Sequence, residues 1–228
     1  MQYEIIGDNL QMVRLQIRPG ERVFAEAGTM VNMSGSMQLQ TTVQGGLLSG
    51  LKRMVSGESF FMTGFSPEGG EGYVSFAGSV PGKIFPVRLT GTDFIAQKEA
   101  FLCAEDGVCL DIAFTKKIRA GLFGGEGFVL QRLSGTGMAF LHCCGDILET
   151  TLAPGEVMKV ETGLVVGFEA SVTYSIALAG GVRTVFFGGE GLFLTTLTGP
   201  GRVVVQSMDP AKLAASLVPF LPKPTSER

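Results

Sequence analysis

The sequence contains no tryptophan and a single histidine, His142, among 228 residues. A Ser–His–Asp triad would need that histidine beside an activated serine, and no Gly-x-Ser-x-Gly nucleophile motif occurs in the chain. Zinc sites use three or four ligands, usually supplied as spaced pairs, and only Cys143 and Cys144 accompany His142. The sequence therefore offers no converging catalytic or metal-ligand set, and we expect neither enzymatic activity nor a cofactor.

Charge is also scarce. Charged residues make up 17% of the chain, against about 25% in an average protein, and the net charge is −3. A nucleic-acid surface needs clustered basic or aromatic side chains, so nucleic-acid binding is disfavoured. The chain has no run of about 18 apolar residues, and its first residues lack the basic start and apolar middle of a secretory signal. We expect a cytoplasmic protein without a membrane span.

Cysteine occurs four times, at Cys103, Cys109, Cys143 and Cys144. In a reducing compartment these are free thiols, and buried free thiols behave as small hydrophobic side chains. Neighbouring strand residues point to opposite faces, so Cys143 and Cys144 cannot line one site. A structural role is therefore favoured over metal binding or thiol chemistry.

Glycine, by contrast, is abundant: 33 residues, about twice the average share. It marks a repeat, because Phe-Gly-Gly-Glu-Gly-Phe at 123–128 returns as Phe-Gly-Gly-Glu-Gly-Leu at 187–192, with a weaker copy, Val-Ser-Gly-Glu-Ser-Phe, at 55–60. After each copy come an apolar run, a glycine-containing turn and a second apolar run. This pattern predicts a β-hairpin after each copy.

A second signature, Glu-x-Gly, precedes each copy, at Glu26, Glu105 and Glu161. Between β-forming residues it predicts a strand, a tight turn with glycine at positive φ, and another strand. The two signatures divide the chain into three β-modules, about 1–78, 79–143 and 144–208. Each module is too short to bury a core alone. We therefore expect one all-β domain over 1–208, with the modules around a pseudo-threefold axis or side by side in one sandwich-like body.

Helix is expected only near the C-terminal end. Asp209 suits the N-cap position and Pro210 the first helical position, and the helix is predicted to run to Val218, where prolines follow. We expect residues 209–228 to form this short helix and a mobile tail.

The segment from Gly45 to Phe61, with the motifs at 123–128 and 187–192, resembles a family of largely uncharacterised microbial proteins. Its eukaryotic relatives are the fungal mitochondrial biogenesis proteins named for altered inheritance of mitochondria. The resemblance covers about residues 1–208 and implies a fold similar to the tryptophan RNA-binding attenuator protein (TRAP), a β-sandwich-like, double-stranded β-helix module, here in triplicate. It implies a homotrimer as an expectation and carries over no catalytic residue. We expect no organelle-targeting segment in this chain, which would be a departure from the fungal relatives.

The repeated glutamates are the sharpest candidate site residues. Around a threefold axis, three equivalent carboxylates could form a ring that holds a cation. Alternatively, each accepts hydrogen bonds from the N–H groups of its own glycine-rich turn, which is favoured because buried polar groups usually have local partners. The candidates are Glu58, Glu126, Glu190, Glu26, Glu105 and Glu161.

Two further features suggest function but favour structural roles. Gly-x-Gly at 135–137 and 199–201 mimics part of a nucleotide-binding loop, but such loops precede a helix, whereas a strand is predicted here, so hairpin turns are favoured. The apolar region from Leu47 to Met62 is expected to form core or a subunit contact, since Lys52 and Arg53 supply too little basic charge for membrane attachment.

We therefore predict a non-catalytic scaffold or protein-interaction protein that self-associates and has a protein partner. The alternative is a small-ligand or RNA-binding module of TRAP-like fold, in which RNA binding is disfavoured by the acidic net charge. An enzyme is the least supported class.

Overall fold

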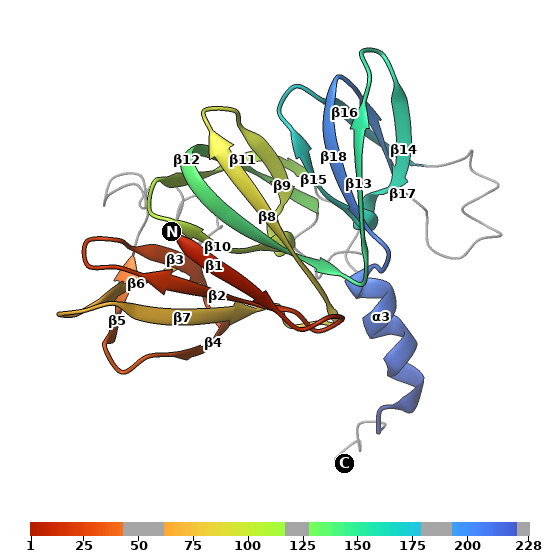
Figure 1. The fold of residues 1–228 in the computed structure, drawn as a ribbon. Helices are drawn as coiled ribbons and strands as arrows, with labels where there is room; N and C mark the ends of the chain where they lie inside the picture. The colour runs from red at the N-terminus through yellow and green to blue at the C-terminus, as the bar shows by residue number, and fades with distance from the viewer. Residues whose placement is uncertain (43–61, 117–127, 179–192, 223–228) are drawn as a thin grey trace.

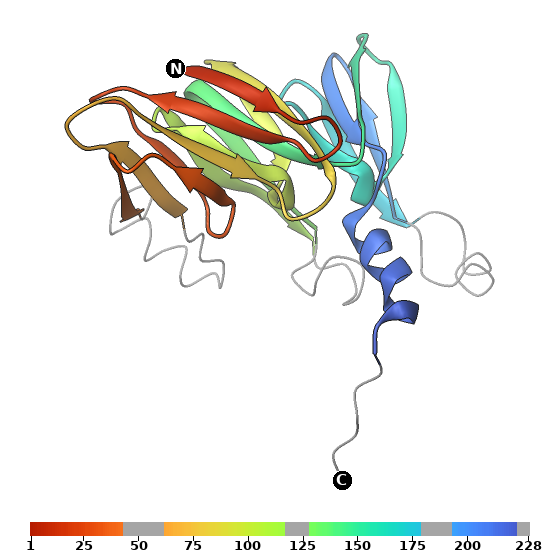
Figure 2. The ribbon, with the colours of Figure 1, turned by 60° about the horizontal axis from the view of Figure 1, so that its bottom comes forward.

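Most of the described chain is β-structure. The computed structural model describes residues 1–42, 62–116, 128–178 and 193–222, and within them the strands form three sheets (Figures 1 and 2). The all-β prediction is confirmed. The apolar region 47–61 and the glutamates Glu58, Glu126 and Glu190 lie outside the described residues.

The strands of residues 1–77 alternate between two sheets. One is a four-stranded antiparallel sheet of order β1-β2-β7-β4, and the other contains β3, β6 and β5 at the end of the largest sheet. The bounds are β1 (Gln2–Ile6), β2 (Met12–Ile17), β3 (Val23–Glu26), β4 (Met30–Met33), β5 (Met37–Thr42), β6 (Met62–Pro67) and β7 (Gly72–Ala77).

One long strand, β12 (Phe128–Cys144), organises the centre of the molecule. Its first half pairs with β11 and β9, and its second half pairs with β8 and β10. Because one strand carries both sets of partners, the two halves of this region are fixed relative to each other. The bounds are β8 (Gly82–Thr90), β9 (Phe94–Gln97), the 3₁₀ turn η1 (Lys98–Ala100), β10 (Phe101–Glu105) and β11 (Val108–Lys116).

The last strands repeat the alternation of the first. A three-stranded sheet has the order β14-β17-β16, while β13, β18 and β15 extend the largest sheet. The bounds are β13 (Ile147–Leu152), β14 (Val157–Glu161), the 3₁₀ turn η2 (Thr162–Leu164), β15 (Val165–Glu169), β16 (Thr173–Leu178), β17 (Phe193–Thr198) and β18 (Gly201–Gln206).

The predicted hairpins after the Gly-Glu signatures are wrong. β6 and β7 lie in different sheets, as do β17 and β18, and in the middle copy both apolar runs belong to the single strand β12. The glycines between the runs do not reverse the chain but let it cross from one sheet to the next. The backbone φ angles of Gly135, Gly137 and Gly201 are 92°, 144° and 143°, values that residues with a Cβ rarely adopt. A hairpin turn and a crossing of this kind need the same glycines, so the sequence does not distinguish them.

Two strand junctions connect successive parts of the chain into one sheet. β10 pairs antiparallel with β3, placing Ala104 opposite Phe24, and β15 pairs antiparallel with β9, placing Phe168 opposite Ile95. The largest sheet therefore runs through the whole molecule in the order β13-β18-β15-β9-β12-β10-β3-β6-β5.

The hydrophobic core crosses these junctions. Each of its three clusters combines side chains from neighbouring parts of the chain. Phe24 of β3, for example, stacks on Phe101 of β10 with ring centroids 5.8 Å apart, and both are fully buried. Burying one such ring contributes about 1.5–3 kcal/mol. The parts therefore depend on one another for a core.

A short ladder of backbone hydrogen bonds, which we call the spine, joins four segments that are far apart in the sequence. Its segments are residues 8–11, 80–84, 143–147 and 206–209. Three backbone hydrogen bonds of one kind link them in sequence: Gly82 N–H donates to Asn9 O (2.8 Å), Gly145 N–H to Pro81 O (3.0 Å) and Met208 N–H to Cys144 O (3.2 Å).

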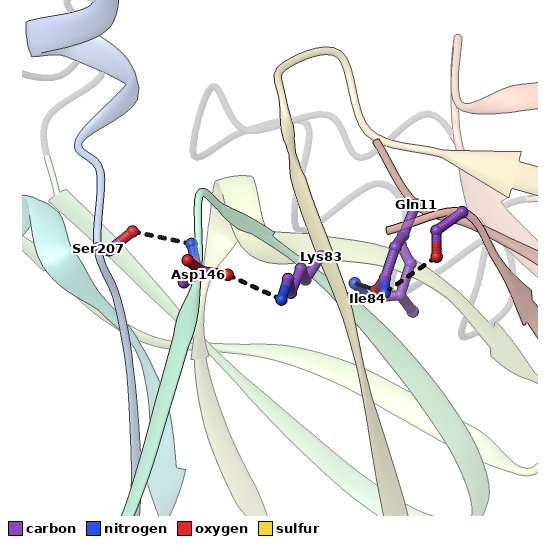
Figure 3. A network of polar contacts seen from close by, with 6 residues as sticks. Gln11, Lys83, Ile84, Asp146 and Ser207 are labelled. Atoms are coloured by element: carbon purple, nitrogen blue, oxygen red, sulfur yellow. Dashed lines mark hydrogen bonds and ion pairs between the residues drawn. The ribbon is translucent and has the colours of Figure 1, made fainter. Parts of the chain in front are cut away.

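Side chains reinforce the spine (Figure 3). The Ile84 N–H donates to Gln11 Oε1 at 2.9 Å, and the Asp146 N–H donates to Ser207 Oγ at 2.8 Å. Lys83 Nζ lies 2.8 Å from Asp146 Oδ1, and this hydrogen bond raises the pKa of Lys83. Since the Lys83–Asp146 pair is largely exposed, the backbone bonds matter more than the ion pair for holding the segments together.

The C-terminal helix begins where it was predicted. α3 (Pro210–Leu217) starts with Asp209 as its N-cap, and the Asp209 carboxylate accepts a hydrogen bond from the Ala211 N–H at 2.8 Å. A 3₁₀ turn, η3 (Val218–Phe220), continues it, and the two project away from the sheets (Figure 2). Within the described residues, no helix has the length and apolar character needed to cross a membrane.

Candidate functional site

A cavity of about 310 Å³ lies beside the spine, where parts of the chain far apart in sequence meet. It is bordered by the β3–β4 turn, the segment that links β7 to β8, the η1 turn, the ends of β12 and β18, and the start of α3. The polar lining residues that matter here are Glu26, Gln97, Glu99, His142 and Gln206. A volume of this size is at the lower end of the range for pockets that bind small organic molecules.

His142 forms one wall of the cavity and is held tightly. Its ring packs on the backbone of Gly78, where a Cβ would lie 2.2 Å from the ring atoms. The side chain is 8% exposed, and a ring N–H donates to the Val80 carbonyl. Burial lowers the pKa of His142 below its ordinary value, against the smaller opposing effect of that hydrogen bond. The imidazole is therefore neutral at physiological pH, and its second nitrogen is an acceptor.

Two buried glutamines line the same cavity as His142. Gln206 accepts the Cys144 N–H at 2.8 Å and donates to the Gly163 carbonyl at 3.0 Å, so its amide ties the end of β18 to β12 and η2. Gln97, 6% exposed, donates from Nε2 to Glu99 Oε2 at 3.3 Å. Strand register places Gln206 and His142 at corresponding positions, opposite Ile147 and Ile84 respectively.

Three of the four cysteines have surroundings that favour a structural role. Cys103, Cys143 and Cys144 are free and buried, while Cys109 is free and exposed on β11. Burial raises the pKa of all three buried thiols, that of Cys143 to about 12. A nucleophilic or metal-binding cysteine must be a thiolate, so these environments oppose both functions.

Glu105 caps the crossing within β12. Its Oε2 accepts the N–H of Met138 at 2.9 Å, at the point where the strand leaves β11 for β8, and its Oε1 lies 3.5 Å from the Met1 ammonium. Glu169 accepts the Arg202 N–H at 3.1 Å in the same way, and Ser34 Oγ accepts the Tyr73 N–H at 3.1 Å. A side-chain acceptor therefore satisfies the first N–H after each crossing.

These contacts correct the sequence alignment of Glu105. Glu26 and Glu161 end β3 and β14, which pair with β6 and β17, whereas Glu105 ends β10 and matches Glu169 at the end of β15. Glu169 was not among the predicted site residues, although the spacing from Phe128 to Leu192 equals that from Glu105 to Glu169. The residue that corresponds to Glu26 and Glu161 in the middle copy is Gln97, at the end of β9.

The candidate glutamates that the structure describes have separate surroundings. Glu26 borders the cavity, Glu105 caps β12, and Glu161 forms an ion pair with Lys212 of α3. Across residues 1–42, 62–116, 128–178 and 193–222, no group of three histidine, cysteine, aspartate or glutamate side chains is placed to hold a metal ion.

The repeats and the fold can be compared with known proteins. The sequence matches the family described as Mitochondrial biogenesis AIM24 over residues 3–208. This chain belongs to the AIM24 family. An uncharacterised protein of Streptococcus pyogenes serotype M6 is 30% identical over 219 residues, which cover 92% of this chain and 87% of that protein. The X-ray structure of a Streptococcus pyogenes protein superposes with a TM-score of 0.80 at 26% identity, covering 96% of this chain and 99% of that one.

The neutral buried His142 of this AIM24-family chain makes its stability depend on pH. An unfolded chain binds a proton at His142 with the ordinary pKa of about 6.5, while the folded state resists protonation. The free energy of unfolding should therefore fall as pH drops below about 6.5 and level off once pH passes below the lower folded pKa.

His142→Gln, which introduces the side chain that Gln206 has at the corresponding position, should remove this part of the pH dependence. The measurement is urea unfolding of both proteins at several pH values between 5 and 8. Carboxylates contribute equally to the two proteins, so parallel curves would show that His142 is not the titrating group.

Proposed function

We propose that this protein is a non-catalytic scaffold of three β-modules that self-associates head to tail through strands β4 and β14. The observation that carries the proposal is that one strand junction occurs twice within the chain, as β10 with β3 and as β15 with β9. Each junction pairs two kinds of strand. One more strand of each kind occurs in the chain: β4 corresponds to β10 and β15, and β14 corresponds to β3 and β9.

The register supports the equivalence of these strands. β4, β10 and β15 each pair with the strand that follows a crossing, and each has a one-residue irregularity in that pairing. The irregularity lies between Met30 and Asn32, between Phe101 and Cys103, and between Val165 and Gly167. β3, β9 and β14 each pair with the strand that precedes a crossing.

β4 and β14 are edge strands. Within the described residues, β4 pairs only with β7 and β14 pairs only with β17. Figures 1 and 2 place them apart, with the β8–β12 region between them. Both expose apolar side chains: Val31 of β4 is 50% exposed and Val157 of β14 is 55% exposed. Unpaired edges of this kind are sites for pairing with another chain.

A second copy of the chain provides the matching edge. Transferring the register of the two internal junctions places Asn32 of one copy opposite Val160 of the next, and Met33 opposite Lys159. The two edges differ, so the contact is heterologous and produces a closed ring or an open filament. A ring of three copies agrees with the homotrimer and TRAP-like arrangement expected from the family resemblance.

Single charge substitutions on the two edges should each prevent self-association. A charged side chain on an edge strand opposes pairing of that edge with another chain. Val31→Lys and Val157→Lys, each at an exposed valine of one edge strand, should therefore each be monomeric by size-exclusion chromatography with light scattering, where the unmodified chain forms an oligomer. Each variant retains one intact edge, so an equimolar mixture should form a heterodimer and nothing larger.

Leu39→Lys on β5 and Leu148→Lys on β13 are matched controls, because both leucines are at least 50% exposed on other edge strands. They should leave the oligomer intact. A monomeric unmodified chain, or a mixture of Val31→Lys and Val157→Lys that fails to form the heterodimer, would refute the head-to-tail contact.

Small-ligand binding is a second candidate function, favoured by the cavity beside the spine. The cavity does not include β4 or β14, so this function is compatible with self-association and independent of it.

A further inference from the structure

A lysine stands on β14 at the place where the two internal strand junctions have a buried apolar side chain. Phe24 of β3 and Ile95 of β9 occupy this place in the internal junctions, as their pairing with β10 and β15 shows. The pairing of β3, β9 and β14 with the strands that precede the crossings assigns Lys159 to the same place on β14. Phe24 is 1% exposed and Ile95 is 5% exposed, whereas Lys159 is exposed.

The two apolar side chains pack into the core of the part of the chain that follows. Phe24 belongs to the cluster that contains Phe101 of β10, and Ile95 belongs to the cluster that contains Phe168 of β15. When the β4 strand of a second copy pairs with β14 in the same register, the side chain at position 159 is directed toward the cluster that contains residues of β2 and β7. An apolar side chain suits this place, and the chain has a charged one.

The Lys159 ammonium forms no ion pair with a carboxylate of the described residues, although Lys83 and Lys212 each form one. Glu161, two residues further along β14, is the partner of Lys212. A lysine can extend its ammonium from an apolar contact to water, but only by giving up side-chain freedom. It therefore weakens the pairing of an edge strand without forbidding it, and lysine is common on such strands.

We propose that Lys159 sets the strength of the head-to-tail contact and keeps it weak and reversible. This inference rests on the proposed self-association through β4 and β14. The internal junctions bury an apolar side chain at this place and are part of the fold. The junction between copies has the same backbone pairing without that burial, so it dissociates on dilution.

Replacing the lysine by the residue that β9 has at this place should strengthen the contact. Lys159→Ile should lower the dissociation constant of the oligomer about tenfold or more, because an isoleucine side chain is buried in place of a charged one. Sedimentation velocity over a dilution series measures this constant. Lys159→Arg retains the charge and should not lower it.

Arg88→Ile is the matched control for general stickiness. Arg88 is an exposed basic residue on β8, so the substitution removes the same charge and adds the same apolar side chain away from β4 and β14. It should leave the dissociation constant unchanged. Equal tightening by Arg88→Ile and Lys159→Ile, or no tightening by Lys159→Ile, would refute the role of Lys159.

Combining Lys159→Ile with Val31→Lys separates this inference from the proposed contact. Val31→Lys should cancel the gain, because it obstructs the β4 edge that receives β14. If Lys159→Ile gives no gain while Val31→Lys and Val157→Lys still form their heterodimer, only the role of Lys159 is refuted. If the heterodimer fails and Val31→Lys does not cancel the gain, the head-to-tail contact itself is refuted.

Discussion

Gly82→Ala is expected to lower the free energy of unfolding by about 4 kcal/mol, the largest effect of any substitution considered for this protein. Gly82 is buried in the spine, where its N–H donates to Asn9 and its carbonyl accepts from Gln11. A Cβ at this position would lie 1.9 Å from the carbonyl oxygen of Cys143 and 2.9 Å from its carbonyl carbon. These are backbone atoms of β12, so the added methyl group can be accommodated only by separating the segments.

Thermal or urea unfolding measures this effect, with an expected loss of melting temperature of about 10 °C. Gly35→Ala and Gly70→Ala are matched controls, because a Cβ at either position has no neighbouring heavy atom within 4 Å and neither φ is positive. Both should change stability by less than about 0.5 kcal/mol. A Gly82→Ala protein as stable as these controls would show that the spine does not hold the parts of the chain together.

Glu105→Ala should destabilise the protein by about 2 kcal/mol. The substitution leaves the N–H of the buried Met138 without its acceptor at the crossing within β12. Glu105→Gln retains an oxygen that can accept this hydrogen bond and should cost less than half as much. Glu169→Ala, which removes the acceptor of the Arg202 N–H, should have an effect in the same direction.

Urea unfolding monitored by circular dichroism distinguishes this explanation from a simple charge effect. Glu4 is exposed on β1, so Glu4→Ala changes the net charge by the same amount and should be close to neutral. If Glu105→Gln and Glu105→Ala were equally destabilised, the contribution of Glu105 would come from its charge beside the Met1 ammonium rather than from capping β12.

The sequence was sufficient for the class of the fold and for the helix. Alternating apolar runs separated by glycine indicate β-structure, and Asp209 followed by Pro210 predicts the helix start, because these features depend on local backbone geometry. The pairing of the strands could not be predicted in this way. β6 and β7, or β17 and β18, are close in sequence, yet they pair with strands more distant in the chain, and only the packing of the sheets decides this.

The candidate site shows the same limit. Glu26 was singled out and does border the cavity, and His142 was noted as the lone histidine, but nothing in the sequence places the two together. Gln97 and Gln206 were missed, because an isolated glutamine has no motif and its role depends on its neighbours in space. Glu105 was misaligned because Glu-x-Gly occurs at the end of more than one kind of strand in this fold.

The spine also explains how the repetition ends. Leu10, Gly82, Gly145 and Met208 occupy successive places in the same hydrogen-bonded ladder, and after the first three the chain continues into β2, β8 and β13. Two residues after Met208 stands Pro210, which has no N–H to offer a partner strand and whose ring favours the first turn of a helix. A proline at this one position therefore acts as a terminator: it fixes the length of the array and turns the chain out of the sheet.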